Sequence, residues 1–195
     1  EEDLEKRKQR GQGLTRPEIA VLLSYAKITF TKDLLVSDIP DNPNMRVWLH
    51  DYFPDRIQKK YASEIERHLL CREIIATTLA NELVNRLGPT YVKSVMLRTG
   101  AACAEVAKAY VIAREAFDLR KIWEQIESHD HDVAANVQLQ ALRDTATLAH
   151  SGINWLLTRM GRELDISVDT DVFRKGVLAL RDQIDGFMTG AMRQS

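Results

Sequence analysis

Apolar residues follow a heptad rhythm in the second half of the chain, between about residues 133 and 160. They are separated alternately by four and three residues, a spacing typical of one continuous amphipathic helix. These positions are Ala135, Leu139, Leu142, Ala146, Ala149, Ile153, Leu156 and Met160. Because alanine has a short side chain, we expect another helix to come close at Ala146 and Ala149.

A second helix of the same kind is predicted over about residues 171–192. Its apolar positions are Phe173, Val177, Leu180, Ile184, Phe187 and Ala191. A loop of roughly ten residues joins the two predicted helices, and a short connection of this kind favours antiparallel neighbours. We therefore expect the two long helices to pack on each other.

The first half of the chain is interrupted by all of its prolines, at positions 17, 40, 43, 54 and 89. Thr15 and Glu18 have the spacing of a capping box, and Pro17 suits the first turn of a helix. We predict a helix that begins there and breaks at Thr31 or Ser37. Its apolar face would be Ile19, Leu22, Leu23, Ala26 and Phe30.

Further helices follow from stop signals and capping residues. A short one is expected around Met45–Tyr52, and a long one from about Ser63 to Leu87, stopped by Gly88 and Pro89. Shorter helices are predicted over 90–99, 101–117 and 119–128, before the long helix of the heptad segment. Asp118 is the expected N-cap of the helix over 119–128, and Asp132 that of the heptad helix.

The predicted fold class is all-α: an irregular antiparallel helical bundle of about seven to nine helices, with two long helices near the C-terminus. Residues 1–13 form a charged linker or frayed helix, and residues 14–195 a helical domain. A break between sub-lobes is expected at residues 88–89, where Gly88 precedes Pro89.

Composition narrows the function classes. The chain has 195 residues, 45% of them hydrophobic, and a formal net charge of −1, which gives no reason to expect nucleic acid as a partner. No apolar run is long enough for a membrane span, and no signal peptide is evident. Two cysteines make no disulfide framework, so we expect a cytoplasmic protein. The missing initiator Met suggests a piece of a longer polypeptide.

Two segments resemble ligand motifs but lack the context these need. Gly11 and Gly13 form a Gly-x-Gly pair, yet a charged run precedes them and Arg16 stands where a dinucleotide site needs the third glycine. His129 and His131 are two residues apart, which does not place them on one helix face, and no cysteine lies near them in the sequence. We expect a connector at the first segment and a polar interhelical turn at the second.

The cysteines and the basic run also favour structural roles. Cys71 has His68 three residues earlier on the same predicted helix face, a pairing that can lower a thiol pKa, but a small buried side chain is the commoner use of cysteine. For Cys103 too, we expect a small buried side chain. Residues 6–10 are basic but follow an acidic stretch without interleaved aromatics, which is typical of a solvated helix.

Three tryptophans and two asparagines remain. Trp48, Trp123 and Trp155 lie among aliphatic residues, where packing inside or between helices is expected. Asn81 and Asn85 are helical neighbours beside apolar residues, a setting that needs compensation. The expected compensation is a hydrogen bond to a neighbouring helix or loop, and the alternative is contact with a ligand.

Several ordered segments resemble the large bacterial NAD-specific glutamate dehydrogenases. They are GLTRPEIAVLLSYAKI at 13–28, YFP at 52–54, REIIATTLANELVNR at 72–86, TGA at 99–101, AYVIAREAF at 109–117 and WEQIE at 123–127. The resemblance extends from about residue 13 to 160 and weakens over the final predicted helix.

The resemblance implies the far C-terminal part of a very large enzyme that oxidises L-glutamate with NAD. Such a part would be non-catalytic and would pack on the catalytic core of the same polypeptide, within a homo-oligomer, in a structural or regulatory role. It implies NAD as cofactor of the whole enzyme but none in this segment. We assign no catalytic, cofactor-binding or metal-ligating residue, and we expect the segment alone to be inactive. The alternative is a free-standing helical module that binds a partner helix or an apolar ligand.

A docking surface is expected in the proline-rich segment 37–54. It concentrates apolar side chains in a stretch that looks too short and too broken to bury them all, and exposed apolar patches usually mark interaction sites. They are Ile39, Met45, Val47, Trp48, Leu49, Tyr52 and Phe53. The alternative is that the segment folds back and closes one end of the bundle.

Overall fold

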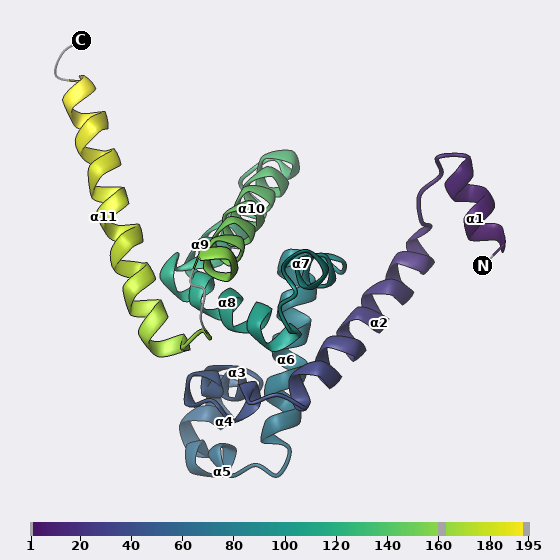
Figure 1. Ribbon diagram of the computed structural model, residues 1–195. Helices are drawn as coiled ribbons and strands as arrows, with labels where there is room; N and C mark the ends of the chain where they lie inside the picture. The colour runs from purple at the N-terminus through teal and green to yellow at the C-terminus, as the bar shows by residue number, and fades with distance from the viewer. Residues whose placement is uncertain (1, 160–162, 193–195) are drawn as a thin grey trace.

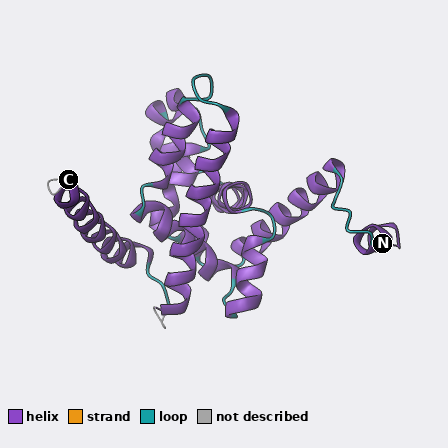
Figure 2. Cartoon of the chain, turned by 90° about the horizontal axis from the view of Figure 1, so that it is seen from above, coloured by secondary structure: helices purple, strands orange, loops and turns teal. Residues whose placement is uncertain are grey.

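The computed structural model describes residues 2–159 and 163–192, and every regular element within them is a helix (Figures 1 and 2). The all-α prediction is therefore confirmed. The α-helices are α1 (Glu2–Gln9), α2 (Arg16–Leu35), α3 (Arg46–Asp51), α4 (Asp55–Lys60), α5 (Ala62–Glu66), α6 (Cys71–Leu87), α7 (Tyr91–Thr99), α8 (Cys103–Ala116), α9 (Leu119–Ser128), α10 (Ala135–Arg159) and α11 (Ile166–Met192). Two short 3-10 helices, η1 (Ile39–Asp41) and η2 (Pro43–Met45), precede α3.

Helices α6 and α8 form the centre of the molecule. Helix α6 packs against α2 and α3, whereas α8 packs against α10 and α11. Helix α8 is buried on nearly all sides, which suits a sequence rich in alanine and β-branched residues; even its Lys108 and Arg114 are buried. One cluster of buried side chains runs through both helices, so residues before and after Gly88 share a core.

Helices α2 and α11 each extend away from this core at one end (Figures 1 and 2). The C-terminal part of α2 is anchored by Phe30 and Leu34, but its N-terminal part carries apolar side chains into solvent. The expected apolar face of α2 is therefore buried only towards Phe30, with Leu23 and Ala26 at its edge. The exposed apolar side chains of α2 are Ile19, Val21, Leu22, Tyr25 and Ile28.

The capping box at the start of α2 is present, as predicted. The Glu18 carboxylate accepts hydrogen bonds from the Thr15 backbone N–H and the Thr15 hydroxyl, both at 2.7 Å. It also pairs with Arg7, and this contact ties α1 to α2. The Arg7 guanidinium and the two Thr15 donors lower the pKa of Glu18 to about 2.

Attachment of α1 to α2 is expected to weaken as the pH falls from about 4.5 towards about 2. The pKa of Glu18 is lower in the fold than in the unfolded chain, so its contribution is complete above the unfolded value and is lost on protonation. An NMR titration of the Glu18 carboxyl and the Thr15 amide would follow this loss. In Glu18→Gln the Thr15 amide should show no such transition, and a transition that persists there would contradict the assignment.

The chain between residues 61 and 87 is not one helix, contrary to the prediction of a helix from Ser63. Helix α5 ends at Glu66 and α6 begins at Cys71. Between them Leu69 is 96% exposed, and the Leu70 N–H donates to His68 Nδ1 at 3.1 Å. The break allows α5 to pack against α3 and α4 while α6 lies against α2. Short helices such as these raise the count above the expected seven to nine.

The proline-rich segment 37–54 folds largely into the core. The side chains of Ile39, Met45, Trp48 and Leu49 are buried within their own chain. Val47 and Tyr52 are exposed and Phe53 is half-buried, with Tyr52 at 61%. The segment therefore closes one end of the bundle, and the expected apolar patch is reduced to its edge.

The two long helices do not pair along their length, so the predicted antiparallel packing is wrong. Both pack on α8, and they meet where Trp155 stacks on Phe173 with ring centroids 5.3 Å apart. Helix α8 offers an apolar surface to each of them, whereas the heptad pattern specifies a buried face but not its partner.

The predicted heptad seam of α10 is buried only in its second half. Ala149, Ile153 and Leu156 are buried, but Ala135 and Leu139 face solvent. The expected close approach is therefore found at Ala149 and beyond, and Ala146 is half-buried. Met160 and the side chains of Phe187 and Ala191 lie outside the described part of the chain.

The caps predicted for α9 and α10 differ from those observed. Asp118 occupies the N-cap position of α9 with a positive φ of 51°, but its side chain makes no capping hydrogen bond. Helix α10 begins at Ala135, beyond Asp132, so Asp132 does not cap it. Helix α11 begins at Ile166, earlier than expected, because Asp165 caps it by accepting from the Val168 N–H at 2.8 Å.

Candidate functional site

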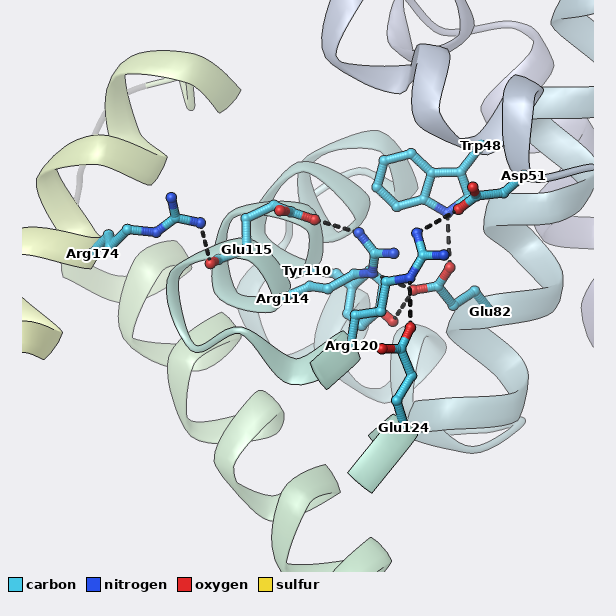
Figure 3. Close-up of polar contacts among 9 residues, drawn as sticks. All are labelled: Trp48, Asp51, Glu82, Tyr110, Arg114, Glu115, Arg120, Glu124 and Arg174. Carbon is cyan, nitrogen blue, oxygen red and sulfur yellow. Dashed lines mark hydrogen bonds and ion pairs between the residues drawn. The ribbon is translucent and has the colours of Figure 1, made fainter. Parts of the chain in front are cut away.

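A half-buried carboxylate, Glu82 on α6, joins three helices in the centre of the molecule (Figure 3). It accepts a hydrogen bond from the Trp48 indole N–H of α3 at 2.8 Å and one from the Tyr110 hydroxyl of α8 at 2.6 Å. The Arg114 Nε lies 2.8 Å from the same carboxylate. The opposite charge of Arg114 and two hydrogen-bond donors compensate for the partial removal of Glu82 from water.

Arg114 is held from several sides. Its side chain is 6% exposed, its guanidinium lies 4.6 Å from the centroid of the Trp48 ring, and it also pairs with Glu115. Burial, followed by the neighbouring Glu82, raises the pKa of Tyr110 well above its usual value. Tyr110 therefore stays protonated and donates to Glu82.

Glu82 and Arg114 of this network line a polar pocket of about 620 Å³ between α3, α6, α8 and α9. At its rim, Arg86 lies 4.4 Å from the centroid of the Trp123 ring and pairs with Glu127 at 2.7 Å. A further rim cation, Arg120, pairs with Asp51 at 2.7 Å and with Glu124 at 3.1 Å (Figure 3). Each guanidinium of the pocket therefore has at least one carboxylate partner.

One face of α6 supplies the polar wall of this pocket. Thr78, Asn81, Glu82, Asn85 and Arg86 have helical spacing and all line it. Among the described residues, the side chains of Thr78, Asn81 and Asn85 make no hydrogen bond to protein. The predicted hydrogen bonds of Asn81 and Asn85 to a neighbouring helix or loop are therefore wrong, and both asparagines face the pocket instead.

Glu82, Tyr110 and Arg114 were not predicted to form a network. Arg114 and Tyr110 are one helical turn apart on α8, whereas Glu82 lies on another helix. The available signal was the polar stripe of α6 set between buried apolar residues, but the stripe does not reveal its partners.

The tryptophans take the expected packing roles. Trp48 and Trp123 are buried, and each lies against an arginine of the pocket. Trp155 stacks between helices on Phe173, although its other side is exposed.

The thiols show no feature of a nucleophilic centre. His68 uses Nδ1 to accept from the Leu70 N–H and makes no hydrogen bond to the Cys71 sulfur in the described structure. Burial raises the pKa of Cys103 to about 12, so this thiol is protonated at neutral pH.

The remaining sequence candidates lie on the surface. Gly11 and Gly13 are exposed between α1 and α2, and His129 and His131 are exposed after α9. Within residues 2–159 and 163–192, no group of His, Cys, Asp and Glu side chains is placed to hold a metal ion. Residues 6–10 continue and end the solvated helix α1, as predicted. No helix in the same described ranges is long and apolar enough to cross a membrane.

Fold and sequence together define the class of the chain. It is an all-α domain, and its residues 11–195 match the family described as the C-terminal region of glutamate dehydrogenase. The chain belongs to this family. The match includes the final helix, where the sequence resemblance was expected to weaken.

The relatives are longer proteins that carry the name NAD-specific glutamate dehydrogenase. The chain is 37% identical over 190 residues to the NAD-specific glutamate dehydrogenase of Halomonas elongata, which covers 97% of the chain and 12% of the relative. It is 37% identical over 194 residues to the Pseudomonas aeruginosa protein of the same name, a match that covers 100% of the chain and 12% of the relative. The Mycobacterium tuberculosis protein of that name is 28% identical over 190 residues, which cover 97% of the chain and 12% of the relative. The chain thus spans about 12% of the length of these relatives.

Proposed function

We propose that this chain is the non-catalytic C-terminal domain of a cytoplasmic NAD-dependent glutamate dehydrogenase. The whole enzyme would convert L-glutamate, NAD and water to 2-oxoglutarate, ammonium and NADH, and NAD would bind outside this segment. The observation that carries the proposal is the family match over residues 11–195. The chain corresponds to only about 12% of each relative, so most of the length of these relatives lies outside the matched part. The domain would pack on the catalytic core of its own polypeptide, within a homo-oligomer.

The free part of α2 supports a docking role. Tyr25 is 66% exposed, and Leu22 and Ile28 are exposed beside it on a helix that leaves the core. A groove of about 700 Å³ between α2 and α7 continues this surface, with Leu97 exposed along it. Apolar side chains in such numbers are unfavourable in water and typical of a covered surface. Since most of the length of the relatives lies outside the chain, the proposed occupant is the rest of the same polypeptide.

The isolated chain is expected to show no glutamate dehydrogenase activity. All of its described elements are helices, so it lacks the strand, glycine-rich turn and helix that seat a pyrophosphate in this class of enzyme. The measurement is NADH absorbance with L-glutamate and NAD, with a full-length enzyme as positive control. Turnover by the fragment at a rate comparable to the full-length enzyme would overturn the non-catalytic assignment.

Docking through α2 is tested by thiol labelling. In Tyr25→Cys, the new thiol should react with iodoacetamide in the isolated chain but be protected in the full-length polypeptide. Leu69→Cys, at an exposed position before α6, is the control and should react in both forms. Equal labelling of the two variants in the full-length protein would exclude α2 as the docking surface.

A second candidate function is supported by an apolar groove of about 510 Å³ between α8, α10 and α11. Phe117, Trp155, Phe173 and Leu180 line it, and polar groups are few. This lining suits the alternative, a module that binds a partner helix or an apolar ligand. An apolar fluorescent dye that binds the isolated chain but not the full-length polypeptide would indicate that the groove is covered in the enzyme. Equal binding to both would favour the alternative.

A further inference from the structure

The polar pocket beside α6 contains hydrogen-bonding groups that the fold does not use. Thr78, Asn81 and Asn85 line it and, within the described residues, bond to no other protein group. Thr78 and Asn81 are half-buried and Asn85 is exposed, so the polar atoms of all three side chains face the solvent of the pocket. These three side chains hold no helix in place, whereas Glu82 holds three. They are therefore available to a ligand.

The charges of the pocket fall into two groups. In the pair between Glu82 and Arg114, Arg114 is buried and Glu82 is also held by Trp48 and Tyr110, so this pair is fixed. The rim pairs are half-exposed, and ion pairs of this kind contribute little stability, so a ligand can exchange with them. These exchangeable pairs are Arg86 with Glu127, and Arg120 with Asp51 and Glu124.

Charge balance at the pair of Arg86 and Glu127, each of which is the other's partner in the pocket, favours a ligand with both charges. A lone anion on Arg86 would displace Glu127 and leave that carboxylate without its partner, and a lone cation on Glu127 would do the same to Arg86. A molecule with both charges replaces both partners at once. The two asparagine amides, each a donor and an acceptor, can bond to a carboxylate and to an ammonium group.

We propose that the pocket between α3, α6, α8 and α9 binds a small zwitterion of the α-amino-acid class. Its carboxylate lies on Arg86 and a side-chain amide of α6, and its ammonium group lies on Glu127 and a side-chain amide oxygen. The inference does not rest on the proposed function, because binding is measured on this chain itself.

The first test is a thermal-unfolding screen of the chain against the common amino acids, followed by calorimetric titration of the best one. At least one amino acid should raise the unfolding midpoint in a saturable way. Its deaminated and its decarboxylated analogue should each bind at least about tenfold more weakly. The proposal is overturned if no amino acid shifts the midpoint at about 10 mM, or if an analogue with one charge binds equally well.

The second test uses variants that remove the unpartnered amides. Asn81→Ala and Asn85→Ala should each weaken binding at least about tenfold, without lowering the midpoint of the ligand-free chain, because neither amide bonds to protein. Asn136→Ala, at an exposed position on α10, is the matched control and should bind as the unchanged chain does. Undiminished binding by both pocket variants would place the ligand elsewhere and overturn the proposal.

Discussion

Glu82→Ala is expected to lower the thermal stability of the chain more than any other substitution considered for the polar pocket. It removes the anion that faces Arg114, and it leaves the Trp48 indole and the Tyr110 hydroxyl without their acceptor. Breaking a buried ion pair from one side costs about 3–5 kcal/mol, and because Glu82 is partly exposed and Arg114 keeps Glu115, we expect about 3 kcal/mol here. In a chain of this size that corresponds to a midpoint lower by about 10 °C, measured by circular dichroism or calorimetry.

Glu124→Ala is the matched control in the same pocket. Glu124 is mostly exposed and pairs only with Arg120, which keeps Asp51, so the expected change is below about 1 kcal/mol. Glu82→Gln should fall between the two, because its amide keeps one acceptor oxygen but does not neutralise Arg114. If Glu82→Ala and Glu124→Ala had the same midpoint, the network around Glu82 would not hold α3, α6 and α8 together.

Local signals in the sequence predicted the helices whose ends are set by neighbouring residues. Helix α6 ends at Leu87, directly before Gly88, which adopts a positive φ of 97°. Helix α2 begins after the capping box of Thr15. Both signals act within one turn of chain, so they do not depend on tertiary structure. The break between α5 and α6 lacks such a signal, because it arises from packing the two helices in different directions.

Helix partners and the polar pocket required the structure. An apolar stripe shows that a face is buried, but α10 and α11 find that burial on α8 instead of on each other. The same applies to the stripe of α6: Asn81 and Asn85 could be singled out, yet Glu82 and Arg114 meet only when α6 and α8 cross. Pairings between distant segments leave no local trace in a single sequence.

Gly152→Leu is expected to loosen the contact between α10 and α8. Gly152 is buried, and a Cβ atom built there would lie 2.7 Å from Phe117 Cε2 and 3.1 Å from Ala113 Cβ. A leucine side chain must push the two helices apart or force these neighbours from their positions. Overpacking of this kind costs about 3 kcal/mol, which lowers the unfolding midpoint by roughly 10 °C.

Gly176→Leu provides the matched control, because it makes the same change on a helix with open space. A Cβ atom at Gly176 meets nothing within 4 Å, so the helix gains the propensity of leucine, worth about 1 kcal/mol over glycine, without a clash. Its midpoint should therefore stay level or rise while that of Gly152→Leu falls. If both variants were equally stable, α8 and α10 would not approach as closely at Gly152 as the structure places them, and the buried half of the α10 seam would have to end before residue 152.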